Sequence, residues 1–124
     1  MRLNHVTVPA LDLGPSIAFY QKLGFHLIVE SPHYARFEIG DETLSVQLRE
    51  DVSMAGNGPH IYLECDDVDA TVAQLKASGL LIDREPADER WLWREAWLTD
   101  PAGTKICLFH AGENRRYPPW RLTD

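Results

Sequence analysis

Hydrophobic and polar residues follow the same series of patterns twice along this chain. In each copy an aspartate precedes apolar residues at positions i, i+4 and i+7, and a glycine ends the pattern. The aspartate is Asp12 in the first copy and Asp67 in the second. An aspartate N-cap, one apolar stripe and a terminal glycine are typical of an amphipathic helix. We therefore expect two helices, near residues 13–23 and 67–78.

The two copies form an internal repeat. His5 in the first copy corresponds to His60 in the second, 55 positions later. Toward the end of each copy the spacing becomes 60, because Gln47 corresponds to Cys107. The second copy therefore contains about five additional residues, which we place in a charged loop over residues 83–90. A repeat of this kind predicts two copies of one supersecondary unit.

Alternating runs before and after each predicted helix indicate strands. The expected strands cover residues 3–8, 25–30, 33–39 and 42–49 in the first copy, and 60–65, 80–84, 91–99 and 104–110 in the second. Each copy is thus one strand, one helix and three strands. We predict a single α+β domain, a cupped mixed sheet with the helices outside, composed of module one (2–49), a linker (50–58), module two (59–110) and a C-terminal tail (111–124).

The two faces of the predicted strands differ in character. Side chains alternate across a strand, so the apolar face of each strand can cover a helix. The opposite faces carry His5 and Thr7; His60, Tyr62 and Glu64; Ser45, Gln47 and Arg49; and Lys105, Cys107 and Phe109. One alternative is that this face is simply exposed to water. Because Tyr62, Cys107 and Phe109 do not suit a solvent face, we interpret it as the lining of a cavity.

Composition and charge exclude several classes of function. The chain has 124 residues with a net charge of −7, which disfavours nucleic acid as a partner. No apolar stretch is long enough to cross a membrane, and the N-terminus lacks the pattern of a signal peptide. Two cysteines are too few for a disulfide framework. We therefore expect a cytoplasmic protein that binds neither nucleic acid nor membranes.

Several short motifs together resemble a known family. They are Leu3-Asn4-His5-Val6, Leu23-Gly24-Phe25, His60-Ile61 and Asp100-Pro101-Ala102-Gly103. In combination they resemble the vicinal oxygen chelate superfamily, which includes glyoxalase I, extradiol dioxygenases, and fosfomycin and bleomycin resistance proteins. The resemblance covers about residues 2–110. It implies paired βαβββ modules that form an open barrel, and a homodimer whose pocket is in some members completed across the interface.

The resemblance also implies a metal site, because metal-binding members place ligands on the first and last strands of each module. The corresponding positions here are His5, Gln47, His60 and Cys107. Such a set would hold a divalent ion such as zinc, nickel, manganese or iron. Cys107 stands where glyoxalase I and the dioxygenases resemble one another in having a glutamate. This departure argues against ordinary glyoxalase I or extradiol dioxygenase activity, and the sequence identifies no catalytic residue.

Two classes of function stay open for a small-molecule pocket between the modules. One is a metal-assisted lyase or isomerase that acts on a substrate with adjacent oxygens, which the two histidines favour. The other is a metal-free protein that binds and sequesters a small molecule, as in bleomycin resistance, which Cys107 favours. The candidate ligand-binding residues are Arg36, Arg49, Tyr62 and Phe109. Among these, Arg36 could bind an anion or lie on the solvated surface.

Aromatic residues outside the predicted helices point to self-association. They are Trp91, Trp93, Trp97, Tyr117 and Trp120. Exposed aromatic surface and open sheet edges favour burial in an interface. We expect a twofold homodimer in which the tail contributes contacts, because Pro118 and Pro119 stiffen it and Trp120 can act as an anchor.

Overall fold

The computed structural model describes residues 1–50 and 57–123, so most of the predicted linker lies outside the described residues. The elements of module one are β1 (His5–Ala10), α1 (Leu13–Leu23), β2 (His26–Ser31), β3 (Tyr34–Ile39) and β4 (Glu42–Leu48). Those of module two are β5 (Ile61–Glu64), α2 (Val68–Ala77), β6 (Arg84–Asp88), β7 (Arg94–Thr99) and β8 (Lys105–His110). A short 3-10 helix, η1 (Gly112–Arg115), follows.

The two modules have the same topology. The strand order is β1-β4-β3-β2 in one sheet and β5-β8-β7-β6 in the other. In each sheet the first and last strands of the module pair in parallel, and the other pairs are antiparallel. The predicted α+β fold of two βαβββ modules is therefore confirmed. Each module forms its own mixed sheet.

Helix boundaries follow from the capping residues that the sequence suggested. The Asp12 side chain accepts a hydrogen bond from the backbone N–H of Gly14, and that of Asp67 accepts one from Ala70. Gly24 ends α1 with a φ of 107°, a left-handed conformation that costs other residues free energy. Both helices begin and end within one residue of the expected bounds.

The second module differs from expectation around its edge strand. The strand expected at residues 80–84 begins only at Arg84, and the charged segment expected as a loop forms β6. The pairing of β6 with β7 shifts register between Arg84 and Ala87, so this edge is irregular. A charged edge strand does not show the alternation of a half-buried strand, and this is why the pattern was misread.

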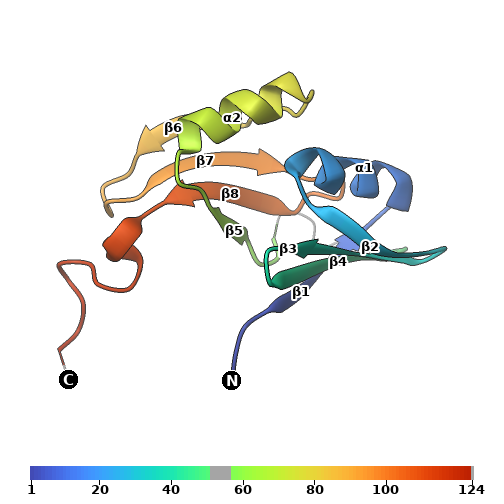
Figure 1. Cartoon of the computed structure of the whole chain (residues 1–124), viewed down its shortest axis with the longest axis horizontal. Coiled ribbons are helices and arrows are strands. Elements are labelled where there is room, and N and C mark those ends of the chain that lie inside the picture. The colour runs from blue at the N-terminus through green and yellow to red at the C-terminus, as the bar shows by residue number, and fades with distance from the viewer. Residues whose placement is uncertain (51–56, 124) are drawn as a thin grey trace.

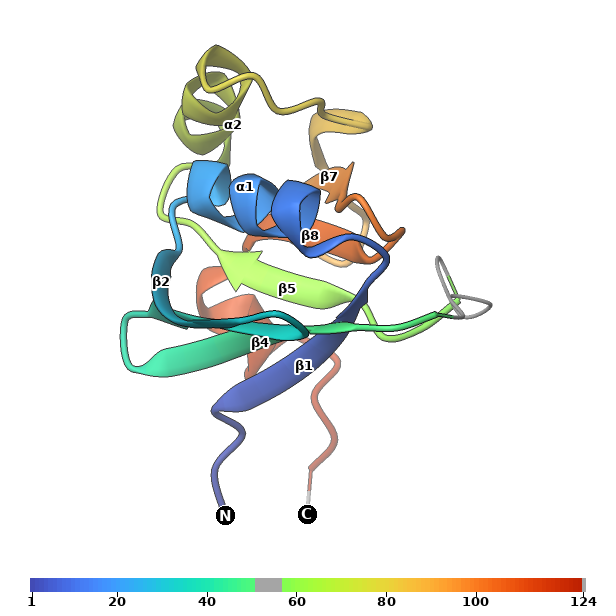
Figure 2. The same cartoon turned by 90° about the vertical axis from the view of Figure 1, so that its right-hand side faces the viewer.

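One hydrophobic core serves both modules. The faces expected to be apolar supply Val8, Leu44, Val46, Ile106 and Leu108, which lie in a single cluster with residues of both helices. Helix α1 packs on β2, β3 and β4, and α2 packs on β6, β7 and β8. Both helices lie on one side of the molecule, and both chain ends lie on the other (Figures 1 and 2). Within the described residues, no helix is both long enough and apolar enough to span a bilayer.

A buried hydrogen bond connects α1 of module one to module two. The Tyr20 hydroxyl donates to Oδ2 of Asp100 over 2.6 Å, and both side chains are buried. Oδ1 of Asp100 accepts the backbone N–H groups of Ala102 and Thr104, which shapes the turn between β7 and β8. Burial, and then the charge of Asp100, raise the pKa of Tyr20 above its ordinary range. The hydrogen bond that joins the modules is therefore one between a neutral phenol and a carboxylate.

Replacing Tyr20 with phenylalanine tests this connection. Tyr20→Phe keeps the ring but leaves a buried carboxylate oxygen without its donor, so we expect the free energy of unfolding to fall by about 1–3 kcal/mol. Urea denaturation followed by circular dichroism measures the change. Tyr117→Phe, at an exposed tyrosine, is the matched control. An unchanged midpoint in Tyr20→Phe would show that the bond does not stabilise the fold.

Candidate functional site

An open cavity of about 720 Å³ lies between the two modules. Its walls are mostly apolar and include Val6, Phe25, Leu44, Ile61 and Leu63. A few polar groups are interspersed, including Asn4, His5, Glu42, Thr43, His60 and Glu64. A concave, largely apolar space with few polar groups is typical of a small-molecule site. The cavity lies between the modules, but Val6, Leu44, Ile61 and Leu63 belong to the strand faces that were expected to cover the helices. Of the faces expected to line a cavity, only His5, His60, Tyr62 and Glu64 contribute to it.

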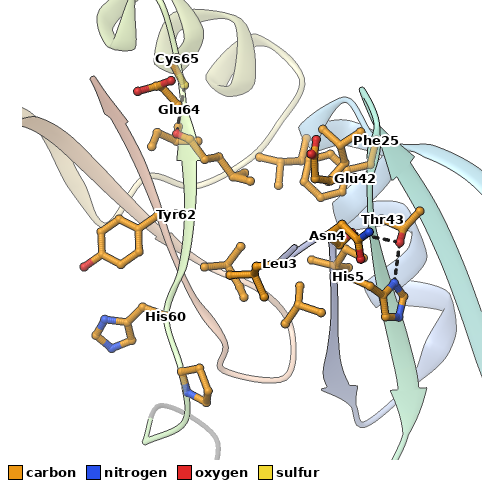
Figure 3. Close-up of a pocket in the computed structure, with 18 of the residues that line it drawn as sticks. Leu3, Asn4, His5, Phe25, Glu42, Thr43, His60, Tyr62, Glu64 and Cys65 are labelled. Atoms are coloured by element: carbon orange, nitrogen blue, oxygen red, sulfur yellow. Dashed lines mark hydrogen bonds between the residues drawn. The ribbon is translucent and has the colours of Figure 1, made fainter. Parts of the chain in front are cut away.

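The two predicted metal-binding histidines lie at this cavity but point apart. His60 and Tyr62 project from the segment of β5 away from β1 and β4, whereas His5 lies beside Thr43 on the other wall (Figure 3). Both histidines are exposed. The repeat thus places them at equivalent positions of two sheets, on the faces opposite the helices.

His5 is held by hydroxyl groups on both ring nitrogens. Its Nδ1 lies 2.6 Å from the Thr43 hydroxyl, and its Nε2 lies 3.2 Å from the Ser45 hydroxyl. Thr43 also donates to the Asn4 carbonyl, which suits a tautomer with the proton on Nδ1 of His5. The ring is therefore oriented from Nδ1, as in metal-binding histidines, but the lone pair on Nε2 faces the hydroxyl groups of Ser45 and Thr7.

The hydroxyl network of His5 extends to Tyr34 and Arg36 on β3. Arg36 donates from Nε to the Tyr34 hydroxyl over 2.8 Å, and its guanidinium lies 5.4 Å from the centre of the Tyr34 ring. Burial opposes ionisation of Tyr34, but hydrogen bonds with Ser45 and Arg36 outweigh it and lower the pKa of the phenol. This face of module one therefore offers polar donors and a positive charge.

The corresponding face of module two is aromatic. The Tyr62 ring makes edge-to-face contacts with Trp93, Trp97 and Phe109, at centroid distances of 5.7–6.0 Å. Trp93 stacks on Phe109 at 4.8 Å. His60 contacts Trp97 edge to face. Of the three tryptophans within the expected strand 91–99, Trp93 and Trp97 lie in this group.

Cys107 and Glu95 lie beneath these aromatic rings. Cys107 is fully buried, and Trp93 and Trp97 pack against its cluster. Burial raises the pKa of the Cys107 thiol, and the charge of Glu95 raises it further. Glu95 was not singled out from the sequence. The feature of the sequence that could have identified Glu95 is its position between Trp93 and Trp97, on the strand face opposite Ala96 and Leu98.

The four predicted metal ligands lie on two different sheets. His5 and Gln47 belong to module one, and Gln47 is exposed on β4; His60 and Cys107 belong to module two. In residues 1–50 and 57–123, no three His, Cys, Asp or Glu side chains lie close enough together to hold a metal ion. His5 is oriented by hydroxyl groups but has no second ligand of this set beside it, and the Cys107 thiol is buried and neutral, so the arrangement within this chain does not fit a four-ligand metal site. The four-residue set stays a prediction.

The predicted ligand-binding residues also divide between the modules. Tyr62 lines the cavity and is 46% exposed, whereas Phe109 is buried under Trp93. Arg36 lies on the polar face of module one, and Arg49 is exposed just after β4. None of the last three lines the cavity. Their role in binding stays a prediction.

Comparisons with known proteins identify the family. The model of the Glyoxalase/Bleomycin resistance protein/Dioxygenase superfamily matches residues 2–108. The metallothiol transferase FosB of Lysinibacillus sphaericus is 30% identical over 119 residues, covering 89% of this chain and 82% of the relative. The chain belongs to the Glyoxalase/Bleomycin resistance protein/Dioxygenase superfamily, as the motifs in its sequence suggested.

Other relatives are longer, and solved structures share the fold. The chain is 33% identical over 76 residues to the CFP32 protein of Mycobacterium bovis, of which it spans 29%. A glyoxalase/bleomycin resistance protein/dioxygenase from Nocardioides has a TM-score of 0.78 at 22% identity, covering 99% of this chain and 90% of that one. A bleomycin-binding protein crystallised with bleomycin has a TM-score of 0.75 at 23% identity, covering 89% and 98% respectively.

The burial of Cys107 predicts an unreactive thiol. In a Cys65→Ser variant, Cys107 is the single remaining cysteine. Because its pKa is raised and its side chain has no exposed surface, we expect iodoacetamide to alkylate it slowly at pH 7–8 and rapidly in urea. Intact-protein mass measures the rate. In a Cys107→Ser variant only the half-buried Cys65 can react, and its alkylation rate serves for comparison. Equal alkylation rates for Cys107 in folded and unfolded protein would contradict its burial.

Proposed function

We propose that the protein binds and sequesters a small molecule without the aid of a metal ion. The observation that carries this proposal is the burial of Cys107 beneath the aromatic rings of module two. At this position the resemblance would require a carboxylate base or an anionic ligand. A neutral, buried thiol supplies neither, so the site retains its pocket without the group that the family's proton-transfer chemistry needs.

The cavity supports the same proposal. Its apolar walls favour binding by removal of hydrophobic surface from water, and His5, Asn4 and Thr43 can orient a bound molecule. The fold is shared with a bleomycin-binding protein that was crystallised with its ligand. The face of Tyr62, Trp93 and Trp97 beside the cavity adds a surface on which a planar or charged group can pack.

A second candidate is a metal-assisted lyase or isomerase acting on a substrate with adjacent oxygens. The observation that favours it is the fixed orientation of His5, whose Nδ1 is held by Thr43. In this case His5, His60 and Gln47 would hold zinc, nickel, manganese or iron, with Cys107 as the fourth position. The metal would polarise an oxygen of the substrate.

A neutral fluorescent probe distinguishes the proposed binding from its alternatives. We expect N-phenyl-1-naphthylamine to bind in the cavity with increased fluorescence, unchanged by EDTA, because apolar walls hold it. Ile61→Trp fills the cavity and should weaken the probe's binding by about five-fold or more. Ile28→Trp, at an exposed isoleucine outside the cavity, is the matched control and should bind as the unsubstituted protein does.

Metal content decides between the two candidates. Near-stoichiometric metal in protein purified without chelators or affinity-tag metal, lost in a His5→Ala/His60→Ala variant, would contradict the metal-free proposal. Turnover of methylglyoxal with glutathione would contradict it as well. If the second candidate holds, Cys107→Glu should raise that turnover, since it restores the carboxylate. Failure of the naphthylamine probe to bind the folded protein would overturn the proposed binding function.

The proposed assembly is a homodimer in which the tail takes part. Each sheet has open edges, and the exposed aromatic side chains of the tail favour burial in a twofold pair. The tail begins in an ordered way, because the Trp93 indole donates to the carbonyl of Asn114 in η1. Beyond it, Tyr117 and Trp120 are each 57% exposed.

Sedimentation velocity tests the dimer and the role of Trp120. We expect self-association at about 50 µM, and weaker association in Trp120→Ser because an aromatic anchor is lost. Leu81→Ser removes another exposed apolar side chain, outside the tail, and should leave association unchanged. A monomer at this concentration would defeat the proposal, and an unchanged dimer in Trp120→Ser would remove that side chain from the interface.

A further inference from the structure

Glu95 is a buried carboxylate in the middle of an aromatic surface. Only 4% of its surface is exposed. Its Oε2 accepts the indole N–H of Trp91 over 2.7 Å, and its Oε1 accepts that of Trp97 over 3.1 Å. Because a carboxylate that accepts a donor on each oxygen is suited to the ionised form, the aromatic face contains a negative charge.

No cation of the described chain balances this charge. Within residues 1–50 and 57–123, Glu95 takes part in no ion pair. The cations on the adjacent strands have other partners: Arg84 pairs with Glu89 at 3.2 Å, and Lys105 donates to the Thr99 hydroxyl. Buried carboxylates are seldom left without a positive partner. A ligand can supply the missing charge.

The rings around Glu95 also favour a positive group. Tyr62 is 46% exposed and touches both Trp93 and Trp97, so the π faces and edges of three rings border the surface. Aromatic faces attract cations, and the attraction is stronger where water is excluded. The net charge of −7 favours the approach of a cation to the molecule as a whole.

We propose that this aromatic face binds a quaternary ammonium group, packed on Tyr62, Trp93 and Trp97 with Glu95 as its counter-charge. The preference for a quaternary group follows from the hydrogen bonds already present. Each Glu95 oxygen accepts an indole N–H, and only 4% of the residue is exposed, so its remaining lone pairs are covered. The rings offer no strong acceptor, so the N–H donors of a primary ammonium would find poor partners on this face. A group without N–H donors has no such cost.

This inference rests on the proposed function, because it names the chemical class of the bound molecule. Tyr62 belongs to β5, the edge strand that borders the cavity, and its ring lies on the aromatic face, so a molecule in the cavity would have to pass around the edge of β5 to bring a charged end to this face. The proposal separates the ligand into an apolar part in the cavity and a cationic part on the face of module two.

Choline and its neutral isostere 3,3-dimethylbutan-1-ol test the proposal on the full chain. Tryptophan fluorescence should show saturable binding of choline, with the neutral alcohol about ten-fold weaker or more. Glu95→Gln should weaken choline binding by about ten-fold while leaving the alcohol unaffected, because only the charge is removed. Glu30→Gln, at an exposed carboxylate on β2 outside the site, is the matched control for net charge.

A second variant keeps the test decisive if Glu95→Gln fails to fold. Tyr62→Leu replaces a half-exposed ring and should weaken choline more than the neutral alcohol. Equal affinity of choline and the alcohol, or unchanged choline affinity in folded Glu95→Gln, would overturn the cation site. If choline fails to bind while N-phenyl-1-naphthylamine still enters the cavity, the cation site is wrong and the proposed binding function stands.

Discussion

The hydrogen bond between Tyr20 and Asp100 determines how the two modules meet. One carboxylate both shapes the turn before β8 and receives the phenol of the other module's helix. Because the whole group is buried, loss of either partner leaves a polar atom unsatisfied inside the shared core. The cavity lies between strands of different modules, so its shape depends on how this hydrogen bond holds the modules together. The two modules share this buried hydrogen bond and one hydrophobic core, so neither is packed as an independent half.

Much of this architecture could be predicted from local patterns. Asp12 and Asp67 mark the helix starts, and the alternation in the first and last strands of each module separates core side chains from the opposite face. These signals are strong because one face of each of these strands is buried in the core. β6 carries no such contrast, since all but one of its residues are exposed, and an edge strand of that kind resembles a charged loop. The superfamily assignment agrees with the motifs.

The site was harder to predict, because its chemistry depends on contacts between strands. The sequence shows that His5 and His60 are equivalent, but not that their side chains point apart in one chain. It shows Cys107 in place of a glutamate, but not that a carboxylate from the neighbouring strand lies beside the thiol. Glu95 is recognisable only when its strand is paired and Trp91 folds back on it from a turn in which Leu92 adopts a φ of 71°.

The separation of the core face from the opposite face within each strand has a consequence for how such proteins diversify. Ile106 and Leu108 belong to the shared core, whereas Cys107 and Phe109, the residues between and after them, belong to a second, smaller cluster. A substitution in the second cluster changes the surface of module two while leaving the packing of helices on sheets in place. Because the module is present twice, the face opposite the core can change separately in each copy. One copy can become polar and the other aromatic while both share one core.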